Sequence, residues 1–156
     1  MKNISHIKTF LFLISTLTFS AISFVMRNIL IYNYNDIDLK LFKIEYIKNY
    51  GAAFSILNSH TLFLTIFSSI ILFFTMFYIL KNLKIFSKYE FFFSSLLTAG
   101  IICNLIERVT DGFVTDYIRL NFVSFPIFNI SDMFICIGAF MLICNILFSN
   151  DVRRNN

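Results

Sequence analysis

Long apolar runs separated by short polar connections dominate this chain. Four of them are free of charged side chains: residues 9–26, 61–80, 91–106 and 133–150. The hydrocarbon core of a bilayer is crossed by about 20 residues of helix, and about 17 is the lower limit. The pattern therefore predicts an all-α membrane protein with four transmembrane helices, at about residues 9–30, 61–80, 91–108 and 127–148. One membrane domain, residues 1–156, accounts for the whole length.

The density of basic residues predicts how the chain is threaded through the membrane. Seven of the 13 Lys and Arg residues lie close together at three places: Lys2 and Lys8, then Lys81, Lys84 and Lys88, then Arg153 and Arg154. The other six are spread over the two remaining connections and the helix ends beside them. Because short basic connections stay in the cytoplasm, we expect both termini and residues 81–90 to be cytoplasmic.

The two outer connections differ in pattern. From Phe42 to Tyr46, apolar and charged side chains alternate, which is the period of a half-buried strand, and Gly51 then ends the run. We therefore expect a small extracytoplasmic β-sheet between helices one and two. The connection at 109–126 contains the turn pair Asp111-Gly112 and ends at the only proline, so we expect a loop there.

Composition excludes several classes of protein. With 58% hydrophobic residues and a mean hydropathy of +0.76, the chain is not an ordinary soluble domain. A net charge of +4 is too small for a nucleic-acid partner. The two histidines are far apart, and the three cysteines lie in apolar runs as packing residues, so we expect no metal site. The basic N-terminus followed by an apolar run resembles a secretory signal, but its length favours an uncleaved first helix.

Two acids, Asp116 and Asp132, are the candidates for chemistry. An acid just inside an apolar stretch costs about 2.5–3.5 kcal/mol on insertion scales and so calls for a function. They are 16 positions apart, yet both belong at the outer membrane boundary. Two carboxyls that approach closely share one proton, and such a pair can hydrolyse a peptide bond. Alternatively, Asp132 caps the fourth helix and Asp116 is a solvated loop acid.

Polar neighbours favour the first interpretation. Asn104 and Arg108 are spaced i, i+4 and share one face of the third helix, where Arg108 can hold an acid or a substrate carbonyl. Asn129 is three positions before Asp132 and can orient it or cap the helix. The alternative for Arg108 is an ion pair with Glu107 or Asp111 at the interface.

The sequences of four segments resemble motifs of one family, the lipoprotein signal peptidases, which are the type II signal peptidases of bacterial membranes. Residues 49–55 read N-Y-G-A-A-F-S, like the family's N-x-G-A-A-F-S. Residues 104–108 read N-L-I-E-R, like N-x-x-D-R, and residues 112–117 read G-F-V-T-D-Y, like G-x-V-x-D-F. Residues 125–132 read F-P-I-F-N-I-S-D, like F-P-x-F-N-x-A-D. The four segments come in the family's order and span nearly the whole chain.

The resemblance implies a role for each candidate residue. Asp116 and Asp132 match the two catalytic acids of these aspartyl peptidases. The positions that match substrate-binding or supporting residues are Asn49, Gly51, Asn104, Arg108 and Asn129. The resemblance implies cleavage of diacylglyceryl-modified prolipoproteins just before the lipobox cysteine, in the bacterial inner membrane, with the active site at its outer face. The expected partners are these substrates and membrane phospholipid, and we expect a monomer without metal or organic cofactor.

The chain departs from the family pattern near the supporting residues. Ser23 and Arg27 lie where the family usually has Asp and Lys, Glu107 replaces an Asp, and Ala99 and Cys103 replace glycines. We expect Arg27 to be a lone interfacial arginine that reaches lipid phosphate. Two alternatives to the peptidase remain at this point. One is an inactive relative that binds lipidated peptides, and the other is a small proton-coupled carrier subunit that uses the two acids as a relay.

Overall fold

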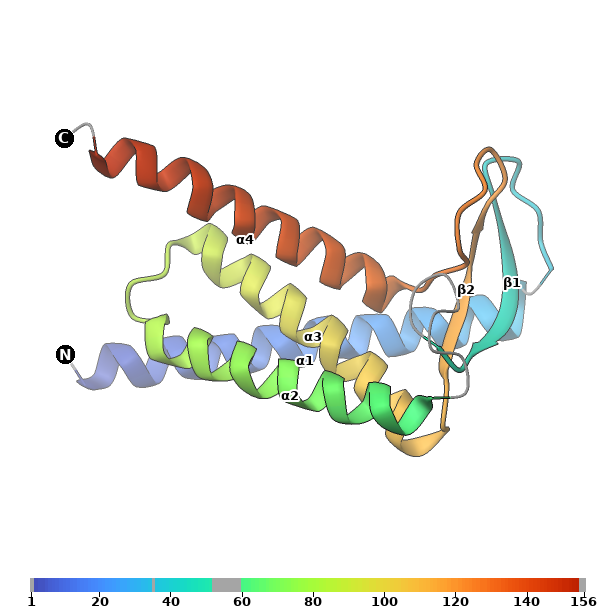
Figure 1. Cartoon of the computed structure of the whole chain (residues 1–156), viewed down its shortest axis with the longest axis horizontal. Helices are drawn as coiled ribbons and strands as arrows, with labels where there is room; N and C mark the ends of the chain where they lie inside the picture. Colours follow the sequence, from blue (N-terminus) through green and yellow to red (C-terminus); the bar gives the residue numbers. More distant parts are fainter. Residues whose placement is uncertain (1, 35, 52–59, 155–156) are drawn as a thin grey trace.

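Four helices run along one direction and a two-stranded sheet closes one end of them (Figure 1). The computed structural model describes residues 2–34, 36–51 and 60–154. The elements in chain order are α1 (Lys2–Tyr34), β1 (Phe42–Asn49), α2 (Thr61–Asn82), α3 (Lys88–Thr110), β2 (Val114–Leu120) and α4 (Ile130–Arg154). The start of α1, the end of α4 and the connection between α2 and α3 lie at the end opposite the sheet (Figure 1).

The four predicted helices are present, with bounds shifted by local chemistry. Helix α3 begins at residue 88 because Ser87 and Glu90 form a capping box, each side chain accepting the other residue's backbone N–H. Helices α1, α2 and α3 contain spans long and apolar enough to cross a membrane. In α4 the described apolar span is shorter, Ile130–Asn145. Side chains along the helices face outward as expected for contact with lipid: Leu17, Phe74 and Phe140 are 68%, 62% and 65% exposed.

The predicted sheet is present, but only its first strand lies between α1 and α2. Strand β1 pairs antiparallel with β2, which comes from the connection between α3 and α4 that we expected to be a loop. The register places Asn49 opposite Val114 and Ile47 opposite Asp116. The sheet therefore brings the end of β1 beside one of the two candidate acids.

Helices α3 and α4 approach closely at glycines. A Cβ atom on Gly100 would collide with the backbone carbonyl oxygen of Ser131, and one on Gly138 would lie 2.8 Å from the backbone nitrogen of Leu97. The first of these contacts is at the start of α4. Glycine at position 100 therefore lets the first turn of α4, which carries Asp132, rest against α3 near Asn104.

Candidate active site

Both candidate acids lie at the sheet end of the helices, and Asp116 is not a solvated loop acid. Asp116 is in the middle of β2 and only 3% exposed. Asp132 is in the first turn of α4 and partly buried. Water is thus largely excluded from Asp116, and its polar atoms depend on protein partners.

Two asparagines hold the Asp116 carboxyl. The side-chain nitrogen of Asn49 donates to Oδ2 at 2.8 Å, and that of Asn129 donates to Oδ1 at 2.9 Å. Asn49 is itself fixed, because its side-chain oxygen accepts the backbone N–H of Gly51 at 2.9 Å. Each carboxyl oxygen therefore has an amide donor from a different element.

Asp132 both caps α4 and takes part in the same network. Its Oδ2 accepts the backbone N–H of Asn129 at 3.1 Å, and its own backbone N–H donates to Asn129 Oδ1 at 2.9 Å. Its Oδ1 accepts the side-chain N–H of Asn104 at 2.7 Å. The helix-cap interpretation of Asp132 is therefore confirmed, and it is compatible with a place in the site. Asn129 touches both acids and so sets their relative position.

Burial changes the protonation of Asp116. The pKa of its carboxyl is raised to about 7, mainly by loss of water and next by the negative charge of Asp132, while the hydrogen bonds from Asn49 and Asn129 act in the opposite direction. Near neutral pH the two neighbouring acids therefore hold one proton between them for part of the time. The next residue, Tyr117, has its pKa raised to about 12 by burial and stays neutral.

Arg108 faces the site and keeps one donor free. It donates to the backbone oxygens of Gly51 at 3.2 Å and Asn104 at 3.4 Å. Its Nε is buried without a hydrogen-bond acceptor. The alternative ion pairs with Glu107 and Asp111 are not seen, because these two acids pair with Arg27. Arg108 thus offers a buried cationic donor beside both candidate acids.

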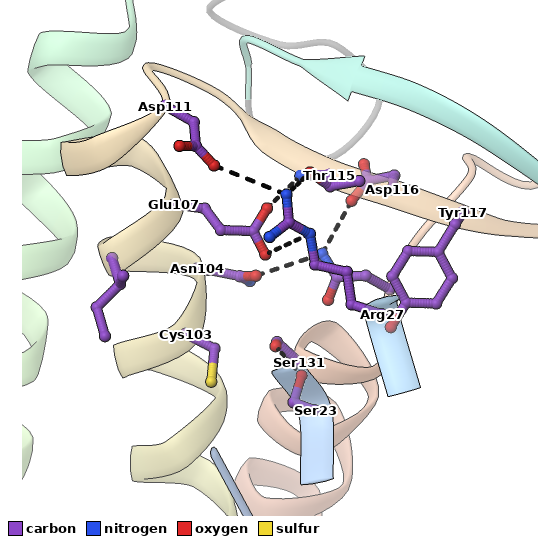
Figure 2. Close-up of polar contacts among 12 residues, drawn as sticks. Ser23, Arg27, Cys103, Asn104, Glu107, Asp111, Thr115, Asp116, Tyr117 and Ser131 are labelled. Carbon is purple, nitrogen blue, oxygen red and sulfur yellow. Dashed lines mark hydrogen bonds and ion pairs between the residues drawn. The ribbon is translucent and has the colours of Figure 1, made fainter. Parts of the chain in front are cut away.

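Four of the positions where the chain departs from the family pattern lie near one another: Ser23, Arg27, Cys103 and Glu107 (Figure 2). The hydroxyls of Ser23 and Ser131 share a hydrogen bond of 2.7 Å between α1 and α4, and the Cys103 thiol donates to the backbone oxygen of Ser20 at 3.8 Å. The expectation of a lone Arg27 is wrong, since it forms ion pairs with Glu107 and Asp111. The partners of these residues are distant in the chain, so no local pattern in the sequence indicates the contacts.

The structure describes only the first three residues of the segment 49–55. Asn49 and Gly51 are in the site as described above, whereas residues 52–55 lie outside the described residues.

Among the described residues, no three His, Cys, Asp or Glu side chains are grouped so that they could share a metal ion.

Fold and site together define a class: a small helical membrane protein with two acids held by asparagines, one in the sheet and the other at the start of the last helix. The family described as signal peptidase (SPase) II matches residues 6–148. The lipoprotein signal peptidase of Streptococcus thermophilus (strain CNRZ 1066) is 36% identical over 103 residues, which cover 66% of this chain and 67% of that protein. That of Lactococcus lactis subsp. lactis (strain IL1403) is 30% identical over 131 residues, covering 84% and 86%. The chain belongs to the signal peptidase II family.

Solved structures agree with this assignment. A bacterial membrane enzyme solved by the in meso method at 2.3 Å resolution superposes with a TM-score of 0.78 at 27% identity, covering 89% of this chain and 88% of that one. A second, at 1.9 Å resolution, gives 0.73 at 28% identity, covering 87% and 92%. The predicted family and fold class are confirmed, and the protein is a membrane protease with lipoprotein signal peptidase function. The alternatives of a carrier subunit and an inactive relative are not favoured.

Proposed function

We propose that this protein is an aspartyl endopeptidase that removes the signal peptide from diacylglyceryl-modified prolipoproteins, with Asp116 and Asp132 as its catalytic pair. The observation that carries the proposal is the double contact of Asn129, which donates to one acid and exchanges two hydrogen bonds with the other. Such a link holds two carboxyls at one place while leaving their remaining lone pairs open to substrate and water.

The reaction runs from the state in which the pair holds one proton, on Asp116. The Asp132 carboxylate takes a proton from water as the water oxygen bonds to the scissile carbonyl carbon, and Asp116 gives its proton to the carbonyl oxygen. Asp132 then passes its proton to the amide nitrogen as the C–N bond breaks. Asp116 takes a proton back from one hydroxyl of the carbon centre, which leaves a carboxylic acid and an amine. The pair returns to its one-proton state.

We expect the polar groups around the acid pair to bind the substrate. We expect the guanidinium of Arg108, which interacts with the charges of both acids, to donate to a backbone carbonyl of the substrate. Asn49, Gly51 and Asn104 hold the acids and Arg108 in place through the bonds described above. The lipid on the substrate cysteine holds the scissile bond at the membrane surface, so much of the positioning comes from the bilayer.

The orientation in the membrane follows from charge. Lys81, Lys84 and Lys88 lie around the connection opposite the sheet, where Lys8 Nζ donates to the backbone oxygen of Lys84 at 2.7 Å. We place this end and both termini in the cytoplasm, and the sheet and acid pair at the outer face of the bacterial inner membrane. We also expect a monomer in contact with phospholipid.

Cysteine labelling in intact cells tests this orientation. Ser124 and Lys84 are both exposed, at the sheet end and at the opposite end. We expect Ser124→Cys to react with a membrane-impermeant maleimide added outside, and Lys84→Cys to react only after the cells are opened. The parent protein with its three native cysteines gives the background. Equal labelling of both variants from outside would contradict the four-span topology.

Cleavage of a synthetic peptide tests the function. The purified protein in detergent should cut a lipobox peptide whose cysteine carries diacylglycerol, on the N-terminal side of that cysteine. The same peptide without lipid should be cut at least tenfold less efficiently, because it lacks the anchor that positions it. Mass spectrometry of the products gives the cut site. Absence of cleavage by folded protein, or cleavage elsewhere, would contradict the proposal.

A further inference from the structure

A second polar cluster lies beside Asp116 and takes no part in the chemistry described above (Figure 2). Arg27 from α1 lies between Glu107 of α3 and Asp111, the residue after the end of α3, with nitrogen–oxygen distances of 3.6 and 3.7 Å. The cluster reaches β2 at one residue, Thr115. Arg27 Nη2 donates to the Thr115 hydroxyl at 2.9 Å, and Glu107 Oε2 accepts the Thr115 backbone N–H at 2.6 Å.

Thr115 is fully buried and directly precedes Asp116. Both of its contacts with the cluster involve a charged partner, and such hydrogen bonds are about twice as strong as those between neutral groups. On the other side of Asp116, the backbone N–H of Tyr117 donates to the Phe128 oxygen at 3.1 Å, and the Tyr117 hydroxyl accepts the N–H of Ile130 at 3.3 Å. The backbone of Asp116 is therefore held at both flanking residues.

We propose that Arg27 and Glu107 are positioning residues for Asp116, acting through Thr115. They hold β2 at the depth and rotation at which the Asp116 carboxyl meets the amides of Asn49 and Asn129. This inference rests on the proposed catalytic role of Asp116. No described hydrogen bond or ion pair joins either residue to the oxygens of Asp116 or Asp132, so neither is a catalytic residue.

The contact explains why position 107 carries an acid and position 27 a base. The acid accepts the backbone N–H of Thr115, and the base balances the charge of that acid while it donates to the Thr115 hydroxyl. Without them, two buried polar groups of Thr115 would lose their partners. The strand would then shift to recover hydrogen bonds, and a displacement of about 1 Å at a catalytic group can lower turnover by about 100-fold.

The test compares two substitutions at Thr115. Thr115→Val keeps the shape and the backbone N–H but removes the hydroxyl that Arg27 binds, whereas Thr115→Ser keeps the hydroxyl. For cleavage of the lipidated lipobox peptide, we expect Thr115→Val to lower kcat about tenfold or more per folded enzyme, with KM within about threefold of the parent. Thr115→Ser should keep kcat within about threefold of the parent.

A second pair of variants tests Glu107. Glu107→Leu removes the acceptor for the Thr115 N–H, and Glu107→Gln keeps one, so we expect a large fall in kcat in the first and a smaller fall in the second. In the double variant Thr115→Val/Glu107→Leu, the loss should be smaller than the product of the single losses, because both release the same residue. Thr65→Ala is the packing control: it removes a partly buried hydroxyl whose hydrogen bond to the Thr61 oxygen stays within α2, away from Thr115 and both acids, and its kcat should stay within about threefold of the parent.

Folded protein is quantified by thermal unfolding in detergent, and Asp116→Asn is assayed beside these variants. A parent-like kcat in Thr115→Val, a change confined to KM, or equal losses in Thr115→Val and Thr115→Ser would each overturn the positioning role. If Glu107→Leu does not fold, the Thr115 pair still decides. Cleavage by Asp116→Asn would overturn the proposed function. An inactive Asp116→Asn with a parent-like Thr115→Val would overturn only the positioning role.

Discussion

Replacing either Asp116 or Asp132 with asparagine should stop cleavage of the lipidated lipobox peptide. We expect kcat to fall by at least about 10²–10⁴-fold, the contribution of a positioned acid or base, and further if the pair acts as a unit. An amide neither takes the proton of the attacking water nor passes a proton to the carbonyl oxygen. The measurement is turnover of the peptide per folded enzyme, followed by separation of the products.

The substitutions also disturb the hydrogen bonds that hold the acids. All four carboxyl oxygens accept an N–H, so an asparagine at either position must turn its NH₂ group toward another donor. Some loss of stability is therefore expected, and thermal unfolding in detergent has to accompany each assay. Asp38→Asn is the matched control, because Asp38 is an exposed acid that also accepts two N–H groups. Near-parental turnover in Asp116→Asn or Asp132→Asn would remove that residue from the mechanism.

The helices were predictable because their signal is local. An uncharged run of sufficient length has few alternatives to a membrane helix, and such runs are visible one window at a time. Strand β2 has no such signal. Its first four residues, 114–117, are all buried, so polar and apolar side chains do not alternate along it. A strand covered on both faces, with a buried acid in its middle, looks like an irregular loop in the sequence.

The site was predictable as a set of residues but not as a geometry. The motifs name Asp116, Asp132 and Asn129, and the i, i+3 spacing indicates the mutual capping of the last two. That Asn129 also donates to Asp116 depends on how β2 lies over the start of α4, which no local pattern encodes. The same limit applies to Arg27, whose partners on α3 are set by the packing of two helices distant in sequence.

The kcat/KM for cleavage should fall steeply as the pH rises above about 7. Because the folded-state pKa of Asp116 is about 7, the proton that the proposed mechanism places on Asp116 is lost as the pH rises through this value. We expect kcat/KM to fall about tenfold per pH unit above about pH 7, that is, about 100-fold by about pH 9. Tyr117 does not contribute, since its pKa of about 12 keeps it neutral over this range. A rate that rises from pH 7 to 9 would contradict the one-proton mechanism.

The same pKa makes stability depend on pH, which can be measured without substrate. The carboxyl of Asp116 has an ordinary pKa of 3.8 and one of about 7 in the folded protein, so the folded state binds more protons between these values. The stability of the fold should therefore fall as the pH rises from about 4 to about 7 and level off above that. The charged and polar groups facing Asp116 are Asp132, Glu107, Arg108 and the two asparagines, and all of them remain in Asp116→Asn. That variant should lose this part of the pH dependence of thermal unfolding, and an unchanged profile would show that Asp116 does not titrate there.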